Sequence, residues 1–189
     1  MSIRSAEDIL ASTELVIVGA GEGETVAGIV DALDGHWKPG HIVLHTSAEH
    51  GIAVLDTATR AGAIPLAVHP VLAFTGTSLD LHRLKGAYFG VTAPNVALPI
   101  AQALVVEMGG EPFVVAEEDR PAYADAVGAV ASFSRAIIDN ATFRLSEIGV
   151  ERPGEVLRAL AHSTVEEALR ESSDGAVDPI ERMLDDSDD

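Results

Sequence analysis

Polar side chains follow two short apolar segments of the chain at the positions where those segments end. His45, Thr46 and Ser47 close the first segment, and His69 closes the second. An unperturbed histidine has a pKa of roughly 6.5, so both histidines could move a proton at neutral pH. The hydroxyl of Ser47 could hold a ligand oxygen. His69, Ser47 and His45 are therefore our candidate catalytic residues.

The two segments and the residues between them have the pattern of a strand–helix–strand unit. Both segments are short and apolar, whereas residues 52–59 place apolar side chains at helical spacing. Such units build parallel sheets, and ligands of open α/β sheets bind beyond the carboxyl ends of the strands. If the two strands are neighbours, we expect His45, Ser47 and His69 along one edge of the sheet.

Each candidate also has a structural interpretation, which stays open here. Ser47 could cap the following helix, His45 could be a satisfied buried histidine, and His69 with the proline after it could shape a turn. The chain has no G-x-S-x-G turn for a hydrolase nucleophile, so we disfavour hydrolysis. His41, His45 and His50 lack a carboxylate at metal-ligand spacing, so we predict no metal site.

The same stretch resembles a known family. The markers are His45-Thr46-Ser47, Gly62-Ala63-x-Pro65-x-x-x-His69-Pro70, Phe74, Gly76-Thr77-Ser78, Phe89-Gly90-Val91-Thr92, Met108-Gly109-Gly110 and Pro121-x-Tyr123. They are similar to a Rossmann-like dehydrogenase-type family with a C-terminal domain of unknown function, related to the 6-phosphogluconate dehydrogenase superfamily. The resemblance fades after about Ser132. It implies a dinucleotide-binding lobe, a helical lobe and NAD(P)-dependent reductase activity, with NAD or NADP as cofactor.

A glycine-rich turn lies between a predicted strand at 15–18 and a predicted helix at 25–33. Gly19 and Gly21 of this turn, together with Thr46, are the candidate cofactor-binding residues. The turn fits a dinucleotide poorly, because Glu24 stands where helix–strand packing needs Gly or Ala. The carboxylates of Glu22 and Glu24 would also repel a pyrophosphate. We therefore prefer a plain strand–helix turn whose acids favour the helix N-terminus, and keep the nucleotide site as the alternative.

The family comparison indicates a divergent member. Residues 5–18 correspond to the segment before and within the family's fourth strand, so we expect that the chain starts late or that the cofactor half has been lost. The family has a histidine after its tyrosine and an asparagine about eight residues later, where this chain has Ala124 and Ser132. Of a further family motif near the C-terminus, only Pro179 and Arg182 are matched.

Composition excludes several classes of partner. The 189 residues include 12 basic and 30 acidic side chains, for a net charge of −18, which disfavours nucleic acid and anionic lipid. The 47% hydrophobic content supports a core, and the absence of cysteine excludes disulfides. No apolar run reaches the roughly 18 residues that span a membrane, and the N-terminus has no signal-peptide pattern. We expect a cytoplasmic protein.

The fold class predicted is α/β, a partial Rossmann-like parallel sheet followed by a helical C-terminal lobe. We expect strands near residues 15, 42, 65, 88 and 113, a long, heavily buried helix at 120–148, and a second helix from Pro153 to Glu171. The domains predicted are a truncated Rossmann-like lobe at 1–118, a helical dimerisation lobe at 119–172 and an acidic tail at 173–189. The long helix has a wider apolar stripe than one partner needs, so we predict a homodimer through it.

The function inferred is that of a divergent oxidoreductase-family protein of unknown substrate, catalytically inactive as this chain stands. A small ligand or a partner would bind at the rim formed by His45, Ser47, His69 and Phe74. One alternative is an active NAD(P)-dependent reductase or dehydrogenase of a small carbonyl or hydroxy acid. The other is a non-catalytic interaction or assembly protein.

The glycine turn generates the first prediction. Because Glu22 and Glu24 oppose a pyrophosphate, NADH and NADPH should bind the purified chain weakly or not at all. Fluorescence titration measures this directly. Binding at micromolar concentration, about −8 kcal/mol, would contradict the prediction, as would a crystal with a pyrophosphate at Gly21.

Overall fold

The computed structural model describes residues 5–21 and 23–173. Glu22, Pro179, Arg182 and the predicted tail beyond residue 173 lie outside the described residues. The chain forms two compact units, residues 1–131 and 132–189, and the long helix α6 (Arg120–Glu147) contributes to both. No described helix is both long enough and apolar enough to cross a membrane.

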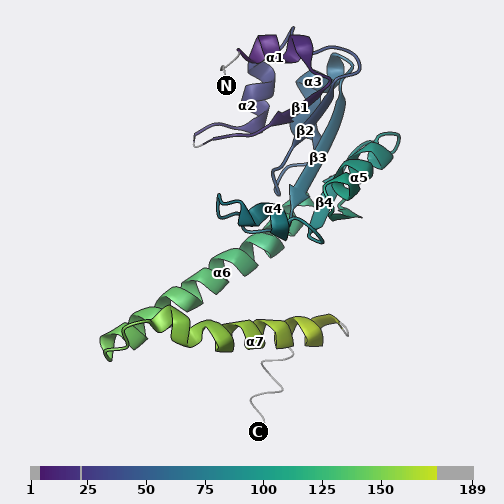
Figure 1. Cartoon of the computed structure of the whole chain (residues 1–189). Helices are drawn as coiled ribbons and strands as arrows, with labels where there is room; N and C mark the ends of the chain where they lie inside the picture. The colour runs from purple at the N-terminus through teal and green to yellow at the C-terminus, as the bar shows by residue number, and fades with distance from the viewer. Residues whose placement is uncertain (1–4, 22, 174–189) are drawn as a thin grey trace. The chain divides into compact units, whose positions relative to one another are not determined.

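A five-stranded sheet forms the centre of the first unit (Figure 1). Its strands lie side by side in chain order: β1 (Leu15–Val18), β2 (Ile42–His45), β3 (Ile64–Pro70), β4 (Tyr88–Thr92) and β5 (Glu111–Val114). The five predicted strand positions are confirmed. The first three strands are parallel, as expected for a strand–helix–strand unit, and β4 and β5 are parallel to each other.

The β3–β4 pair is antiparallel, so the sheet is mostly rather than wholly parallel. The N–H of Val71, just after β3, donates to the carbonyl of Tyr88 at 2.9 Å, so the chain enters β4 at the end where it left β3. The connection contains only the short helix α4 (Leu79–Arg83) and a loop held by the Asp80 carboxylate, which accepts from the N–H groups of Thr75 and Gly76. A parallel neighbour would require a crossover to the opposite end of the sheet.

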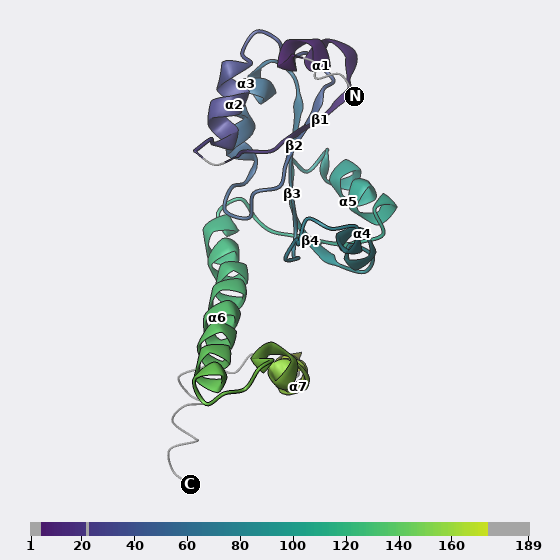
Figure 2. The ribbon, with the colours of Figure 1, turned by 60° about the vertical axis from the view of Figure 1, so that its left-hand side comes forward.

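Helices lie on both faces of the sheet (Figure 2). One face carries α2 (Val26–Ala32), the 3₁₀ helix η1 (Ile52–Leu55) and α3 (Asp56–Arg60), and the other carries α5 (Leu98–Glu107). Each layer has its own apolar core, one around Val30 and Val43 and one around Leu66 and Val105. The first helix, α1 (Ala6–Ser12), begins after Ser5, whose hydroxyl accepts from the N–H of Asp8.

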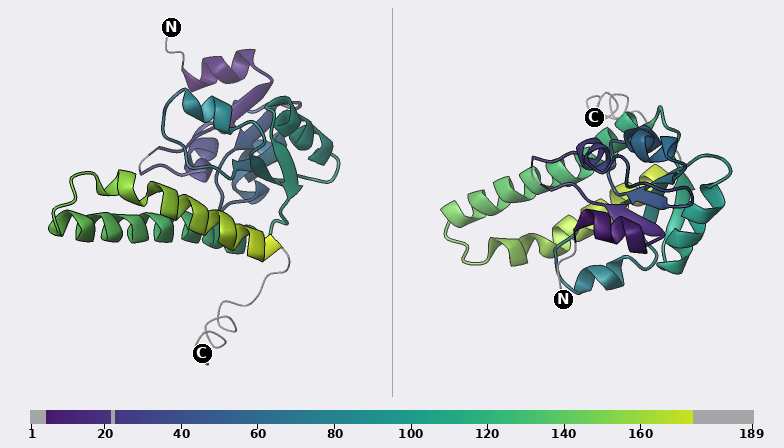
Figure 3. Two further views of the ribbon diagram at one scale, coloured as in Figure 1. Left: turned by 60° about the horizontal axis from the view of Figure 1, so that its bottom comes forward. Right: turned by 90° about the horizontal axis from the view of Figure 1, so that it is seen from above.

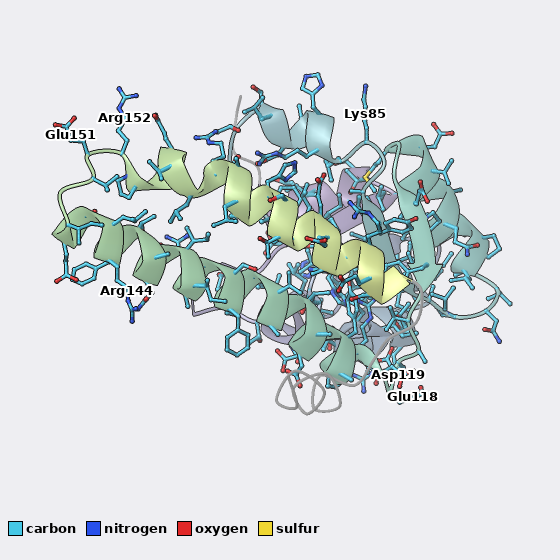
Figure 4. All side chains as sticks on the ribbon, turned by 90° about the horizontal axis from the view of Figure 1, so that it is seen from below. Lys85, Glu118, Asp119, Arg144, Glu151 and Arg152 are labelled. Atoms are coloured by element: carbon cyan, nitrogen blue, oxygen red, sulfur yellow. The ribbon has the colours of Figure 1, made fainter. Side chains whose placement is uncertain are left out.

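The second unit contains the rest of α6 and the helix α7 (Pro153–Ser173), which turns back along α6 (Figure 3) and faces it across Ile137 and Leu160. Gly149 ends the α6 turn with a φ of 87°, a conformation that favours glycine. Charged side chains gather at this connection, where Arg144, Glu151 and Arg152 point into solvent (Figure 4).

The heavy burial predicted for α6 is wrong for the chain by itself. Arg120 is its one buried residue, whereas Val130, Phe133 and Ile137 are 71%, 68% and 66% exposed. In the described part of the second unit, α7 is the helix that faces α6. One helix covers only one side of an apolar stripe this wide, so the other side stays exposed.

The packing of α5 against β4 generates the second prediction. A Cβ at Gly110 would lie 2.4 Å from Cε2 of Phe89 and 2.9 Å from the carbonyl oxygen of Ala87, so Gly110→Ala should destabilise the fold by about 1–3 kcal/mol. The matched control is Gly128→Ala, in open space within α6, which should stabilise by about 0.5–1 kcal/mol. Urea unfolding followed by circular dichroism measures both, and equal stabilities would show that Gly110 is not a close-contact position.

Candidate functional site

A hydrogen-bonded histidine–tyrosine pair lies where β3 meets the first turn of α6. His69 Nδ1 lies 2.7 Å from the hydroxyl oxygen of Tyr123, and the two rings meet edge-on with centroids 5.6 Å apart. Both side chains are half-buried. The position opposite His69 on β4 is Gly90, where a Cβ would lie 2.9 Å from the tyrosine hydroxyl. The glycine therefore makes the space that the tyrosine ring occupies.

A fully buried arginine, Arg120, lies beside this pair. Its guanidinium donates to the oxygens of four residues: Thr92 Oγ1 at 2.7 Å, Ala67 O at 3.0 Å, Gly90 O at 3.1 Å and Ser47 O at 3.5 Å. The Thr92 hydroxyl in turn donates to the carbonyl of Val115 at 2.6 Å. The guanidinium carbon also lies 5.7 Å from the centre of the Tyr123 ring, within range of a cation–π interaction.

The electrostatics of this cluster keep the histidine and the tyrosine neutral near pH 7. Burial lowers the pKa of His69, and the charge of Arg120 lowers it further. Burial raises the pKa of Tyr123, although Arg120 opposes that change. A neutral imidazole has one donor and one acceptor nitrogen, and a phenol both donates and accepts. Besides their mutual hydrogen bond, the pair therefore retains donor and acceptor atoms of the kind that a hydroxyl or carbonyl oxygen requires.

His45 is held differently, inside the protein. It is fully buried, its Nδ1 accepts from the N–H of Ser47 at 3.1 Å, and its Nε2 lies 2.7 Å from the carbonyl oxygen of Gly51. Because Nδ1 is the acceptor, Nε2 carries the proton and donates to Gly51. Burial lowers the pKa of His45 and keeps it neutral. This geometry matches the structural alternative and leaves neither ring nitrogen for a ligand.

Ser47 closes a turn and does not cap the following helix. Its hydroxyl accepts a long bond, 3.4 Å, from the N–H of His50. The first amides of η1, those of Ile52 and Ala53, donate to the Glu117 carboxylate at 2.7 and 3.0 Å. Ser47 and His69 lie at the same end of the sheet around Arg120, yet their side chains share no direct hydrogen bond among the described contacts.

The glycine-rich turn is closed by a hydrogen bond to a glutamate of the same turn. The N–H of Gly21 donates to the Glu24 carboxylate at 3.1 Å, so the amide that a phosphate would need is already used. The following helix, α2, begins with Thr25 as its cap, whose hydroxyl accepts from Gly28. A cavity of about 310 Å³ beside the turn is lined by Val18, Ala20, Glu24, Thr25, Val26, Thr46, Ser47 and His50. The residues present do not fit a dinucleotide pyrophosphate.

Arg120 and Glu117 were not noted in the sequence, and Thr92 was noted only as a family marker. Tyr123 was noted only as a family marker. One signal could have identified Arg120, because a cation is unfavourable at the positive N-terminal end of a helix and needs a specific reason to be there. Phe74, which we had placed on the rim, is 56% exposed and lies on an apolar surface formed with β1 and α5.

The sheet order, the antiparallel β4 and the C-terminal helices define an α/β protein with a Rossmann-like sheet followed by a helical region. A Rossmann-like domain family matches residues 1–70, and the domain of unknown function DUF2520 matches residues 87–185, more than half of the chain. The chain belongs to the DUF2520 domain family. No protein of curated function matches the sequence.

Solved structures share the fold at low sequence identity. Protein TM1727 from Thermotoga maritima is 19% identical with a TM-score of 0.63, and the match covers 82% of this chain and 58% of that one. Pyrroline carboxylate reductase from Plasmodium falciparum, with NADP bound, is 11% identical with a TM-score of 0.65 over 97% and 66% of the two chains. 1-Pyrroline-5-carboxylate reductase from Streptococcus pyogenes is 16% identical with a TM-score of 0.62. That match covers 95% of this chain and 64% of the reductase. This chain thus spans less than two thirds of each of these three structures.

The Arg120 network generates the third prediction. Arg120→Met would leave the carbonyls of Ala67 and Gly90 without their buried donor, at about 1–3 kcal/mol each, so the loss of stability should be about 3 kcal/mol or more. The control is Arg135→Met, because that side chain is 83% exposed on α6 and should change stability by less than about 0.5 kcal/mol. Urea unfolding compares the two, and a difference below about 1 kcal/mol would show that the network contributes little.

Proposed function

We propose that the chain is an oxidoreductase-family protein that binds a small ligand at the His69–Tyr123 pair and has no dinucleotide site of its own. The observation that carries the proposal is the 2.7 Å bond between His69 Nδ1 and the Tyr123 hydroxyl beside the buried Arg120. The reductases among the structures of the same fold support the family assignment. The Gly21–Glu24 bond supports the absence of catalysis by this chain alone.

The ligand class follows from what the pair can donate and accept. A neutral histidine and a neutral phenol suit a ligand with a hydroxyl or a carbonyl group, since each can share or receive a proton. The positive charge of Arg120 lies close enough to the tyrosine ring to favour negative charge that develops on a bound oxygen. A small carbonyl or hydroxy compound is therefore the expected ligand.

The direction of the hydrogen bond can be tested through the pKa of His69. We expect the tyrosine hydroxyl to donate to Nδ1, which stabilises the neutral ring, so Tyr123→Phe should raise the pKa of His69 above its wild-type value. Proton NMR of the imidazole between pH 4 and 9 measures it, with the exposed His82 as the internal control. A pKa that falls in Tyr123→Phe would mean that the ring donates instead.

Ligand binding can be measured with the same NMR resonance of the His69 imidazole. Lactate, pyruvate and glycerol at millimolar concentration are suitable probes, and at least one should shift His69 in the wild type and lose that effect in Tyr123→Phe. The low pKa of His69 keeps the neutral form dominant above roughly pH 6.5, so binding should weaken as the pH falls below the folded-state pKa. Absence of any shift at His69 with every probe would contradict the proposed site.

We also propose that the second unit forms a homodimer. Large apolar side chains are exposed along both helices, among them Phe133 at 68%, Ile137 at 66% and Leu160 at 64%. An apolar cavity of about 360 Å³ lies between the helices, lined by Ser134, Ile137, Ile138, Ala141, Leu157, Leu160, Ala161, Thr164 and Val165. Contiguous apolar surface of this kind is unusual for a monomer. The matching helix of a second copy would cover it.

The dimer has a direct test in the size of the protein. Ile137→Asp and Val130→Asp should shift a dimer toward the 19.7 kDa monomer, because each places a carboxylate in the apolar contact. Asn140→Asp adds the same charge at an exposed polar position of α6 and should leave the dimer intact. Sedimentation velocity at micromolar protein and physiological salt decides the case, and a wild-type protein that sediments as the monomer would contradict it.

A further inference from the structure

A cavity with charged side chains lies at the opposite end of the sheet from His69 and Tyr123. Its volume is about 400 Å³, and it is lined by residues 10–14, which lead from α1 into β1, and residues 38–41, which precede β2. Because β1 and β2 are parallel, these two segments meet where both strands begin, and α1 lies at the same end of the sheet (Figure 1). The volume is within the range of small-ligand sites, about 300–1,000 Å³.

His41 lines this cavity and is held rigidly. Its side chain is buried, with 5% of the residue exposed, and its ring meets that of Trp37 edge-on. The main-chain carbonyl of His41 accepts from the N–H of Ile64 at 2.7 Å. The ring nitrogen Nδ1 accepts from the N–H of Lys38 at 3.2 Å. Since Nδ1 is an acceptor, Nε2 carries the proton and is a hydrogen-bond donor.

This Nε2–H has no hydrogen-bond partner among the described contacts of His41. Within residues 5–21 and 23–173, no side-chain nitrogen or oxygen is both unpaired and shielded from solvent. Nε2 therefore belongs to the small exposed part of the ring, and the cavity is the opening that this ring lines. A nearly buried donor in such a position favours a ligand that brings an acceptor atom.

Two charged side chains of opposite sign line the same cavity, those of Lys38 and Glu14. The ion pairs found in the described part of the chain involve neither of them. Glu14 and His41 stand two residues before Val16 and Val43, which are both buried in the core beneath α2. Because side chains alternate along a strand, Glu14 and His41 lie on the same side of the sheet. The cavity thus offers an imidazole donor, an ammonium group and a carboxylate.

We propose that this cavity binds a small free α-amino acid. The carboxylate of the ligand accepts from Nε2 of His41 and pairs with the ammonium of Lys38. Its own ammonium group pairs with the Glu14 carboxylate. The hydroxyl of Thr13 is a second acceptor for that ammonium, because it donates its proton to the carbonyl of Ile9 at 2.8 Å and keeps its lone pairs.

A zwitterion fits these groups better than a ligand with one charge. A simple anion would be repelled by Glu14, and a simple cation would be repelled by Lys38. Ala11 and Pro39 add apolar surface to the lining, so the ligand should have a short apolar side chain. The site is separate from the His69–Tyr123 pair, and the proposal does not depend on the function proposed for that pair.

The experiment compares L-alanine with two compounds that each lack one of its charges. Propionate lacks the ammonium group, and ethylamine lacks the carboxylate. Proton NMR of the His41 imidazole in the full chain, at constant pH, measures binding, with the exposed His82 as the internal control. We expect millimolar L-alanine to shift His41 and not His82, and propionate and ethylamine to bind about tenfold more weakly or less.

Variants at exposed positions test the two charged groups without disturbing the core. Lys38→Met and Glu14→Gln should each weaken the binding of L-alanine about tenfold or more. Lys85→Met removes the other lysine of the chain, which lies outside the cavity (Figure 4), and should bind L-alanine as the wild type does. The proposal would be overturned by a wild-type His41 that does not respond to L-alanine, or by propionate that binds as well as L-alanine. Equal binding by the Lys38 and Lys85 variants would overturn it too.

Discussion

The guanidinium of Arg120 is the constraint on which the candidate site depends. A buried charge is tolerated only when its donors are satisfied, and here the acceptors come from the β2 loop, β3 and β4. Each of these elements must be in place for the arginine to be buried. The same contacts fix the first turn of α6 against the sheet, and that turn presents Tyr123 to His69. The position of Tyr123 beside His69 is thus tied to the packing of Arg120 against the sheet.

Much of the fold could be predicted because it follows from apolar segments and their spacing, which the sequence displays directly. The five strands and both long helices are of this kind. The antiparallel turn into β4 could not be predicted, because an apolar strand has the same pattern in either direction. The Arg120 network was also hidden, since most of its acceptors are backbone carbonyls, which every residue possesses. The apolar surroundings of Phe74 were also not visible in the sequence, because a family marker carries no information on what its side chain contacts.

Several carboxylates in this chain accept hydrogen bonds from backbone amides. In other proteins, amides at such positions are capped by hydroxyl groups or bind ligands. Glu117 binds the amides of Ile52 and Ala53, Glu24 binds that of Gly21, and Asp80 binds those of Thr75 and Gly76. An amide bonded to its own acid is not available to a phosphate, and the acid repels one. In the glycine turn this arrangement disfavours a bound pyrophosphate.

The surface combines strong net charge with local apolar contact areas, and these act over different distances. A charge of −18 repels any acidic partner, but salt screens that repulsion beyond about 8 Å. The β1 edge and the helical hairpin act only on contact, where an apolar area without charges outweighs the residual repulsion. Encounters with poorly matching surfaces therefore gain too little buried area to persist.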